Sequence, residues 1–236
     1  MRRRQVRRPI KTVLMIAAVL TSSLSQAAEN LFLAGVEATS DSSRYFYIGT
    51  ALPLPGSNLG KGVVLHLWAD YQTYSYDAGA TEIDVSVDSL SAALGYHDSG
   101  SSYWWNTRLG VVQSDVGLEP NDPGNDSAGV NTNLKVQLEG ENRSLADFKL
   151  NGGIEYIFGR SAYWMRVRAL MRNDNNSYHG PELIYQGDPE YSAMQLGWVL
   201  NEIVVNKNWS LGLKAGFRFD DSNTSEYAGI ELTIPY

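Results

Sequence analysis

Histidine is the side chain best suited to acid–base catalysis near neutral pH, and this chain has three, His66, His97 and His179. His66 alternates with Trp68 and Asp70 along an extended segment. Asp70 would lie about 13 Å from His66 along such a segment, which is too far to orient the imidazole directly. His97 is expected in a turn. A hydrolase with a Ser–His–acid site is therefore the least favoured of three functional interpretations, and we predict no catalytic residue.

Charged side chains recur on one face of the segment 162–173, where Arg166, Arg168 and Arg172 alternate with apolar residues. An arginine near the midplane of a bilayer costs roughly 2–4 kcal/mol, so in a membrane barrel this face must point to the interior. Glu182 is expected to pair with Arg166 or Arg168. The full ion network predicted for the interior comprises Arg166, Arg168, Arg172, Glu155, Glu182, Lys214 and Arg218.

Aromatic side chains are the second candidate for binding chemistry. A glucan chain can stack the apolar faces of its sugars on flat aromatic rings, and the rings predicted to point inward are Trp68, Tyr74, Trp104 and Trp164. The alternative is that most tyrosines and tryptophans anchor a barrel at the two membrane interfaces.

An acidic segment, Glu119–Asp126, has oxygen-bearing side chains at spacings that could hold calcium, but it lacks the twelve-residue EF-hand arrangement. We expect a solvated loop, or one that contacts lipopolysaccharide through divalent ions. We predict no metal site and no cofactor.

The elements that must position these side chains are β-strands. Alternation with period two dominates, whereas no window keeps a helical period. Between Trp209 and Asp220 apolar residues occupy one face, and glycines, Lys214 and Arg218 the other. A soluble sandwich also alternates, but charges in mid-strand with aromatic residues at the ends of the apolar face favour a wet interior and a lipid-facing exterior. The chain ends on Tyr236, in a pattern similar to the C-terminal signal that the barrel assembly machinery reads.

Counting back from the C-terminus gives twelve strands, each long enough for the ~9–11 residues of a tilted spanning strand. Ten is the alternative, because the first two strands have the weakest pattern. An even number puts both termini in the periplasm. Turn-forming residues separate the strands, among them a long segment from Gly117 to Gly129. The predicted strands are 30–39, 44–54, 62–76, 82–96, 103–115, 130–140, 147–158, 162–173, 177–187, 191–204, 208–219 and 225–236.

Residues 1–27 have the order of a secretory signal peptide: a basic head, a short apolar run and small residues before a cleavage site. Removing them takes away six of the 19 basic residues and none of the 26 acidic residues, which leaves 209 residues with a net charge of −13. Such acidity argues against nucleic acid as a partner. The absence of cysteine excludes disulfides, thiolate metal sites and a lipidated cysteine.

Several segments resemble the cellulose biosynthesis protein BcsS family of outer-membrane proteins. They are the run GVVLHLWADYQTYSYD at 62–77, Leu94-Gly95-Tyr96, the loop 119–123, and Gly180-Pro181-Glu182 followed by Gly187, Asp188 and Tyr191. The resemblance spans nearly the whole mature chain, although Trp104-Trp105 departs from the expected pattern. It implies an accessory role in cellulose or exopolysaccharide production, and no catalytic residue is carried over from it.

We therefore expect an all-β protein: a closed, antiparallel, up-and-down transmembrane β-barrel formed by residues 28–236, monomeric, in the outer membrane of a diderm bacterium. Its expected partners are outer-membrane lipid and lipopolysaccharide, the assembly machinery, and cellulose or another glucan with cellulose synthase components. The favoured function is a non-enzymatic accessory of cellulose biosynthesis or secretion. A narrow porin-like channel is the second interpretation, and a lipid-modifying hydrolase is the third.

Overall fold

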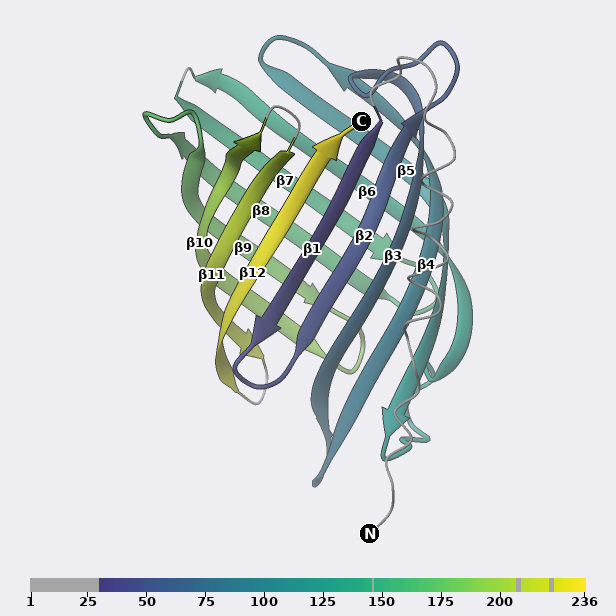
Figure 1. Ribbon diagram of the computed structural model, residues 1–236. Coiled ribbons are helices and arrows are strands. Elements are labelled where there is room, and N and C mark those ends of the chain that lie inside the picture. Colours follow the sequence, from purple (N-terminus) through teal and green to yellow (C-terminus); the bar gives the residue numbers. More distant parts are fainter. Residues whose placement is uncertain (1–29, 146, 207–208, 221–222) are drawn as a thin grey trace.

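The computed structural model describes residues 30–145, 147–206, 209–220 and 223–236. They form a closed barrel of twelve antiparallel strands, in which each strand pairs with the next and β12 pairs with β1 (Figure 1). The predicted fold class and the count of twelve are confirmed. The predicted signal peptide lies outside the described residues. The strands are β1 (Leu31–Thr39), β2 (Arg44–Pro53), β3 (Lys61–Ala78), β4 (Thr81–Ser99), β5 (Tyr103–Glu119), β6 (Gly129–Leu145), β7 (Phe148–Ile157), β8 (Ala162–Arg172), β9 (Tyr178–Gly187), β10 (Ser192–Asn206), β11 (Trp209–Asp220) and β12 (Thr224–Pro235).

The barrel closes where the chain begins and ends. Asn30 and Tyr236 exchange backbone hydrogen bonds of 2.8 and 2.9 Å beside the β1–β12 pair. The start of β1 and the end of β12 lie together at one end of the barrel (Figure 1). In single-chain bacterial barrels with an even strand number this is the periplasmic end, and the longer loops lie at the extracellular end. Among the described residues there is no helix long and apolar enough to cross a bilayer.

The strands β3, β4 and β5 are longer than a membrane requires, with 18, 19 and 17 residues. The β3–β4 hairpin reaches past the β1–β2 turn at the extracellular end (Figure 1). The predicted turn beginning at Gly117 is wrong, because β5 continues to Glu119 and Val116 packs inside the barrel. The connecting loop is shorter, at residues 120–128.

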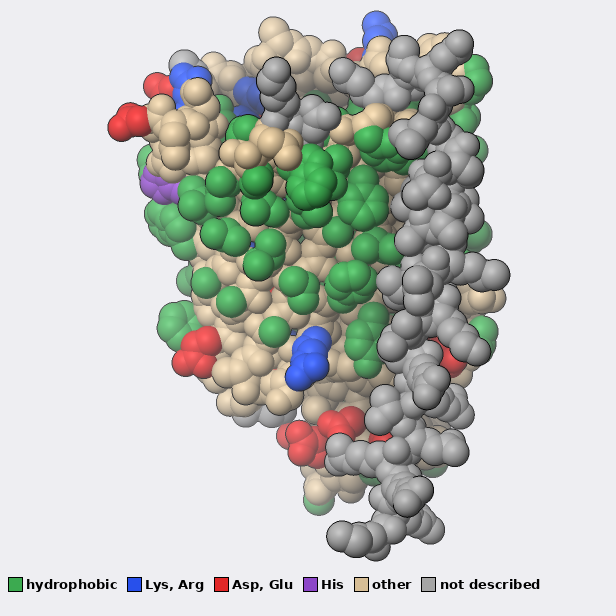
Figure 2. All heavy atoms as spheres, viewed as in Figure 1, with side chains coloured by type: hydrophobic (Ala, Val, Ile, Leu, Met, Phe, Trp, Pro, Cys, Tyr) green, Lys and Arg blue, Asp and Glu red, His purple; other side chains and the backbone are tan. Residues whose placement is uncertain are grey.

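The two faces of each strand have opposite polarity. On β8, Met165, Val167 and Met171 point outward and are 42, 49 and 47% exposed, whereas Arg168 on the other face is 3% exposed. Figure 2 shows hydrophobic side chains over the middle of the visible outer surface, with charged side chains towards its two ends. This is the phase that the alternation predicts, and it gives the barrel an apolar belt suited to hydrocarbon.

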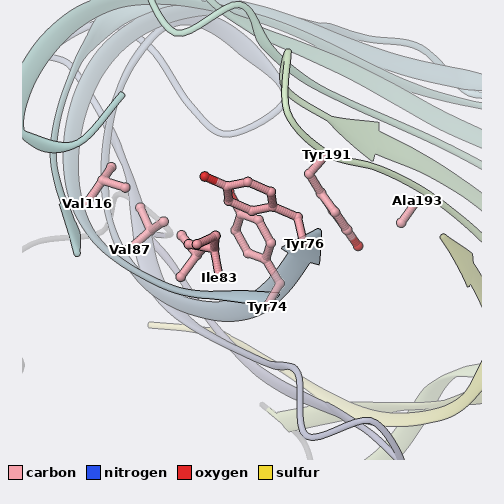
Figure 3. Packing of buried hydrophobic residues seen from close by; sticks show 8 residues of the cluster. Tyr74, Tyr76, Ile83, Val87, Val116, Tyr191 and Ala193 are labelled. Carbon is pink, nitrogen blue, oxygen red and sulfur yellow. The ribbon is translucent and has the colours of Figure 1, made fainter. Parts of the chain in front are cut away.

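Some apolar side chains also pack inside the barrel. Towards the extracellular end, residues of β3, β4 and β5 pack with Tyr191 and Ala193 (Figure 3). On the periplasmic side, Val64, Leu170 and Val199 point inward and are completely buried. Buried polar side chains, among them Lys149 and Asn151, share the periplasmic side with them.

A charge on the outer belt tests this orientation. Val167→Arg, in the middle of β8, should lower the free energy of unfolding by roughly 2–4 kcal/mol, because the guanidinium would enter the hydrocarbon core. Thr224→Arg, at the exposed extracellular start of β12, should cost only about 0–1 kcal/mol because it lies near the interface. Urea titration of the barrel in lipid vesicles measures both values, and equal costs at the two positions would contradict the assigned belt.

Candidate functional site

The candidate site is a cavity of about 250 Å³ inside the barrel. It is lined by residues from all twelve strands. Its walls differ in chemistry. Most of its charged side chains come from β5 to β8, β11 and β12, and most of its aromatic side chains come from β2 and β3. A ligand in this cavity would meet ion pairs on one side and flat rings on the other.

The centre of the ion network beside the cavity is Arg168, which is buried and does not itself line the cavity. Its guanidinium donates to both oxygens of Glu231 on β12, at 3.0 and 2.8 Å, and its Nε donates to Glu182 on the neighbouring strand β9. Arg166 lies 3.8 Å from Glu231 on the same side. A bidentate guanidinium–carboxylate pair fixes geometry as well as charge, so this contact holds β8 to β12 across the lumen.

A second set of contacts extends the wall to β1. Lys214 Nζ lies 2.6 Å from Glu37 and 3.7 Å from Glu231. Gln195 Nε2 donates to Glu37 at 2.6 Å. Both carboxylates of this set are therefore neutralised by cations from other strands, as buried carboxylates require.

A separate cluster lies on the wall formed by β5, β6 and β7. Arg108 donates to Glu139 at 2.6 Å and to Gln137 at 3.2 Å. Lys135 pairs with Glu155 at 2.9 Å. Among the described residues, these pairs form an ion cluster separate from that of Arg168.

The aromatic wall begins with Tyr47 and Trp68, whose rings are stacked at 4.7 Å with an angle of 12°. Glycines make room for them. A Cβ at Gly35 would meet the Tyr47 ring at 2.4 Å, and one at Gly49 would meet the Trp68 ring at 2.0 Å. Since the rings occupy the space above these glycines, they lie against the barrel wall and leave the cavity in front of them.

Further towards the extracellular end, the aromatic residues are Tyr74 and Tyr191 (Figure 3). Their rings lie 4.6 Å apart, and the Tyr74 hydroxyl donates to Asp188 at 3.0 Å. Arg218 lies over the Tyr191 ring at 5.4 Å and donates to its hydroxyl. These contacts anchor the β9–β10 loop inside the mouth of the barrel.

At the periplasmic end of the cavity, two histidine side chains meet. The Nε2 atoms of His66 and His97 are 2.9 Å apart, and His97 Nδ1 lies 2.8 Å from the carbonyl oxygen of Leu59. The prediction that His97 lies in a turn is wrong, because β4 continues to Ser99 and carries His97 inward. His179 lies against Trp198, which is 51% exposed on the outer belt. Within the described ranges, no serine hydroxyl is hydrogen-bonded to any of these histidines.

The structure brings together only part of the predicted ion network. Arg166, Arg168, Glu182 and Lys214 share one cluster with Glu231. Three predicted members lie elsewhere. Arg218 is buried against Tyr191, Glu155 belongs to the β6–β7 cluster, and Arg172 lies at the periplasmic rim.

The prediction for Arg172 is wrong. Its side chain is 39% exposed and pairs with Asp147, which is 75% exposed, at 2.6 Å. Arg172 shares the inward phase of Arg168, but β8 ends at this residue, so the side chain reaches solvent instead of the lumen.

Of the predicted aromatic set, Trp68, Tyr74 and Trp164 line the cavity. Trp164 lies beside Arg166, with the guanidinium 5.2 Å from the ring centre. Trp104 does not line the cavity. It occupies the second position of β5, close to the periplasmic end, and is therefore separated from the other three.

The predicted network left out the members that complete both clusters: Glu37, Arg108, Lys135, Glu139 and Glu231. A signal for them was available, because each falls on the inward phase of its strand. The alternation could have identified these residues as interior, but not their partners across the lumen.

Comparisons with known proteins agree with this fold. The profile of the family described as "Cellulose biosynthesis protein BcsS" matches residues 31–236. Comparison with curated proteins gave no match. Among solved structures, the chain is similar to the translocator domain of the autotransporter NalP from Neisseria meningitidis, at 9% identity and a TM-score of 0.53, covering 95% of each chain.

Two other solved barrels are similar to the same degree. The β domain of the Bordetella autotransporter BrkA has 13% identity and a TM-score of 0.52, over 89% of this chain and all of that chain (100%). The KdgM porin in complex with disordered oligogalacturonate has 14% identity and a TM-score of 0.50, over 85% of this chain and 97% of that chain. Identities this low establish the shared fold alone. The closed barrel and its apolar belt place the protein in the outer membrane.

Removal of Arg168 tests the central cluster. Arg168→Met should lower the free energy of unfolding by about 3–5 kcal/mol, because it leaves the buried Glu182 without its cation and removes the bidentate partner of Glu231. Arg172→Met on the same strand is the matched control and should cost only about 0–1 kcal/mol, since its pair with Asp147 is solvent-exposed. Urea unfolding of the refolded barrels measures both, and a cost for Arg168→Met as small as the control's would contradict the assigned network.

Proposed function

The chain belongs to the cellulose biosynthesis protein BcsS family, and we propose that it is a non-enzymatic accessory that contacts the glucan chain in the outer membrane during its biosynthesis or secretion. In this proposal the lumen is the contact surface, and components of the cellulose synthase are the functional partners. The observation that carries it is the cavity between the stacked Tyr47–Trp68 pair and the charged wall.

The charge of the cavity favours a neutral polymer. Among the described residues, its lining has six carboxylates and five cationic side chains, so the two signs nearly balance. A strongly acidic or basic ligand would gain little from such a lining, whereas sugar hydroxyls can both donate to carboxylates and accept from cations. The carboxylates are Glu37, Asp70, Glu139, Glu155, Asp188 and Glu231, and the cations are Arg108, Lys135, Arg160, Arg166 and Lys214.

The aromatic wall supplies the apolar contact that a sugar also needs. Each sugar of a glucan has two faces of C–H groups, and flat rings offer them apolar surface without competing for hydroxyls. Tyr47, Trp68, Tyr74 and Tyr191 line the cavity from its middle towards its extracellular end. Since the KdgM barrel of similar fold was solved with an oligogalacturonate, a barrel of this size is compatible with a saccharide ligand.

A narrow channel for small polar solutes is the second candidate, because the cavity inside the barrel is lined by polar side chains. Its volume of about 250 Å³ is below the range of about 300–1,000 Å³ typical of small-molecule sites. Such a space suits a short stretch of a saccharide better than a wide flow of water. Salt-bridged side chains and the apolar cluster around Tyr74 and Tyr191 narrow the path further, which is the reason to place the accessory role first.

A hydrolase is the third candidate, and the geometry does not favour it. Two of the three histidines contact each other inside the barrel. The third lies on the outer face against Trp198, on a strand whose start is at the periplasmic end. We therefore propose a function without catalysis.

Loss of the aromatic wall should reduce cellulose output. Trp68→Leu, expressed in place of the wild type, should lower cellulose-dependent dye binding of the cells at least several-fold, to a level close to that of a gene deletion, because the sugar-stacking surface is lost. Trp198→Leu removes an aromatic side chain of the outer belt and is the matched control, which should keep wild-type dye binding.

Permeability separates the two leading candidates. Under the accessory function, the deletion leaves uptake of small antibiotics unchanged, and the purified barrel gives no regular single-channel steps in planar bilayers. Unchanged dye binding in the deletion strain would refute the proposal. Ohmic steps that Trp68→Leu alters would favour the channel.

A further inference from the structure

A second, smaller cavity lies outside the membrane belt, at the extracellular end. It has a volume of about 230 Å³ and is enclosed by the β5–β6 loop, the first residues of β6, the β7–β8 turn and the β9–β10 loop. We call it the outer pocket. It is lined by amides, a guanidinium and two carboxylates, and it has no aromatic side chain among the described residues. Its chemistry is therefore hydrogen bonding.

The β5–β6 loop is held in place by its own polar contacts. The Tyr76 hydroxyl donates to Asp122 at 2.7 Å and accepts from Asn125 Nδ2 at 3.0 Å. Asn125 Oδ1 accepts from the backbone N–H of Ser127 at 2.9 Å, and Asn131 Nδ2 donates to the carbonyl oxygen of Ser127 at 2.9 Å. A wall fixed in this way needs little ordering when a ligand binds.

Two side chains of the pocket keep unused donors. Arg160 is 91% buried, since only 9% of its surface is exposed, and its Nε has no hydrogen-bond partner. Asn133 Nδ2 is also buried without a partner. A buried donor without an acceptor costs about 1–3 kcal/mol. A small shift of either side chain towards an oxygen in the pocket would remove that cost.

The β7–β8 turn directs Arg160 inward. Gly159 and Ser161, on either side of it, both have positive φ angles, of 88° and 51°. A positive φ is uncommon for a residue other than glycine. The turn also approaches Asn133 closely, since a Cβ on Gly159 would lie 2.2 Å from Asn133 Oδ1. The turn that carries Arg160 therefore lies against Asn133, and both side chains line the outer pocket.

From these features we propose that the outer pocket binds neutral, hydroxyl-rich sugar units on the cell-surface side of the membrane. The carboxylates of Asp126 and Glu190 would repel an anion, but they accept hydrogen bonds from hydroxyls, while Arg160 and Asn133 donate to them. Arg160 also lines the lumen cavity, so the outer pocket and the lumen meet at this side chain. The choice of a glucan as the ligand rests on the proposed function.

Direct binding by the purified, refolded full barrel tests the proposal. The probes are cellohexaose and, as the anionic counterpart of equal length, hexagalacturonate, each titrated by calorimetry. The wild type should bind cellohexaose and should bind hexagalacturonate at least tenfold more weakly. Asn133→Ala and Arg160→Gln should each weaken cellohexaose binding about tenfold or more.

The matched control is Thr132→Ala, because Thr132 is the neighbour of Asn133 on β6 and is exposed on the opposite face. It should bind within twofold of the wild type. Folding of every variant is checked by the shift in gel migration between unheated and boiled samples. Should Arg160→Gln fail to fold, Asn133→Ala carries the test by itself, since Asn133 does not line the lumen cavity.

Three outcomes would overturn the proposal that the outer pocket binds a neutral sugar. They are no binding of cellohexaose, tighter binding of hexagalacturonate than of cellohexaose, and wild-type affinity for cellohexaose in Asn133→Ala. Failure of the proposed function is a different result. In that case the deletion strain keeps its dye binding, while Asn133→Ala still weakens cellohexaose binding by the purified barrel. Conversely, Asn133→Ala could keep wild-type affinity for cellohexaose while Trp68→Leu lowers dye binding. That result would refute the outer-pocket proposal and support the proposed function of the lumen.

Discussion

Arg168 contacts two carboxylates, Glu182 and Glu231, inside the barrel. This contact follows from the different environments of the two faces of the sheet, which constrain every strand. A sheet closed inside a bilayer has hydrocarbon on one face and a narrow, partly dry interior on the other. Charges cannot occupy the first face without a cost of several kcal/mol, and they can occupy the second only when they are paired. Because side chains alternate along each strand, that single constraint fixes the phase of β8 and, through strand pairing, of its neighbours.

Pairing inside the lumen also determines what space is left for a ligand. The two ion clusters draw long side chains of β5 to β8, β11 and β12 against each other. On β1 and β2, Gly35 and Gly49 allow Tyr47 and Trp68 to lie flat. The remaining cavity therefore has an ionic side and an aromatic side. That combination suits a neutral sugar chain, which has both hydroxyl edges and apolar faces.

Much of the fold could be predicted from the sequence, because strand period and turn residues are local properties. The inward phase of Arg166, Arg168 and Lys214 followed from the cost of charge in lipid. The ion-pair partners of these residues could not be predicted in the same way. Arg168 and Glu231 are 63 residues apart in the chain, and their contact depends on the tilt and stagger of the closed barrel. The prediction for Arg172 was wrong for a related reason, since the environment of this residue depends on where β8 ends. The outer pocket is built from loops, whose conformation alternation does not encode.

The opposite polarity of the two faces can be measured directly, because the chain has no cysteine and every introduced cysteine is unique. Nitroxide labels placed one at a time at positions 211 to 219 of β11 would report, by spin resonance in lipid vesicles, their collisions with oxygen dissolved in lipid. The account predicts a period of two, with high collision rates at the odd positions and low rates at the even positions, which include Lys214 and Arg218. Uniform rates, or high rates at the even positions, would contradict it.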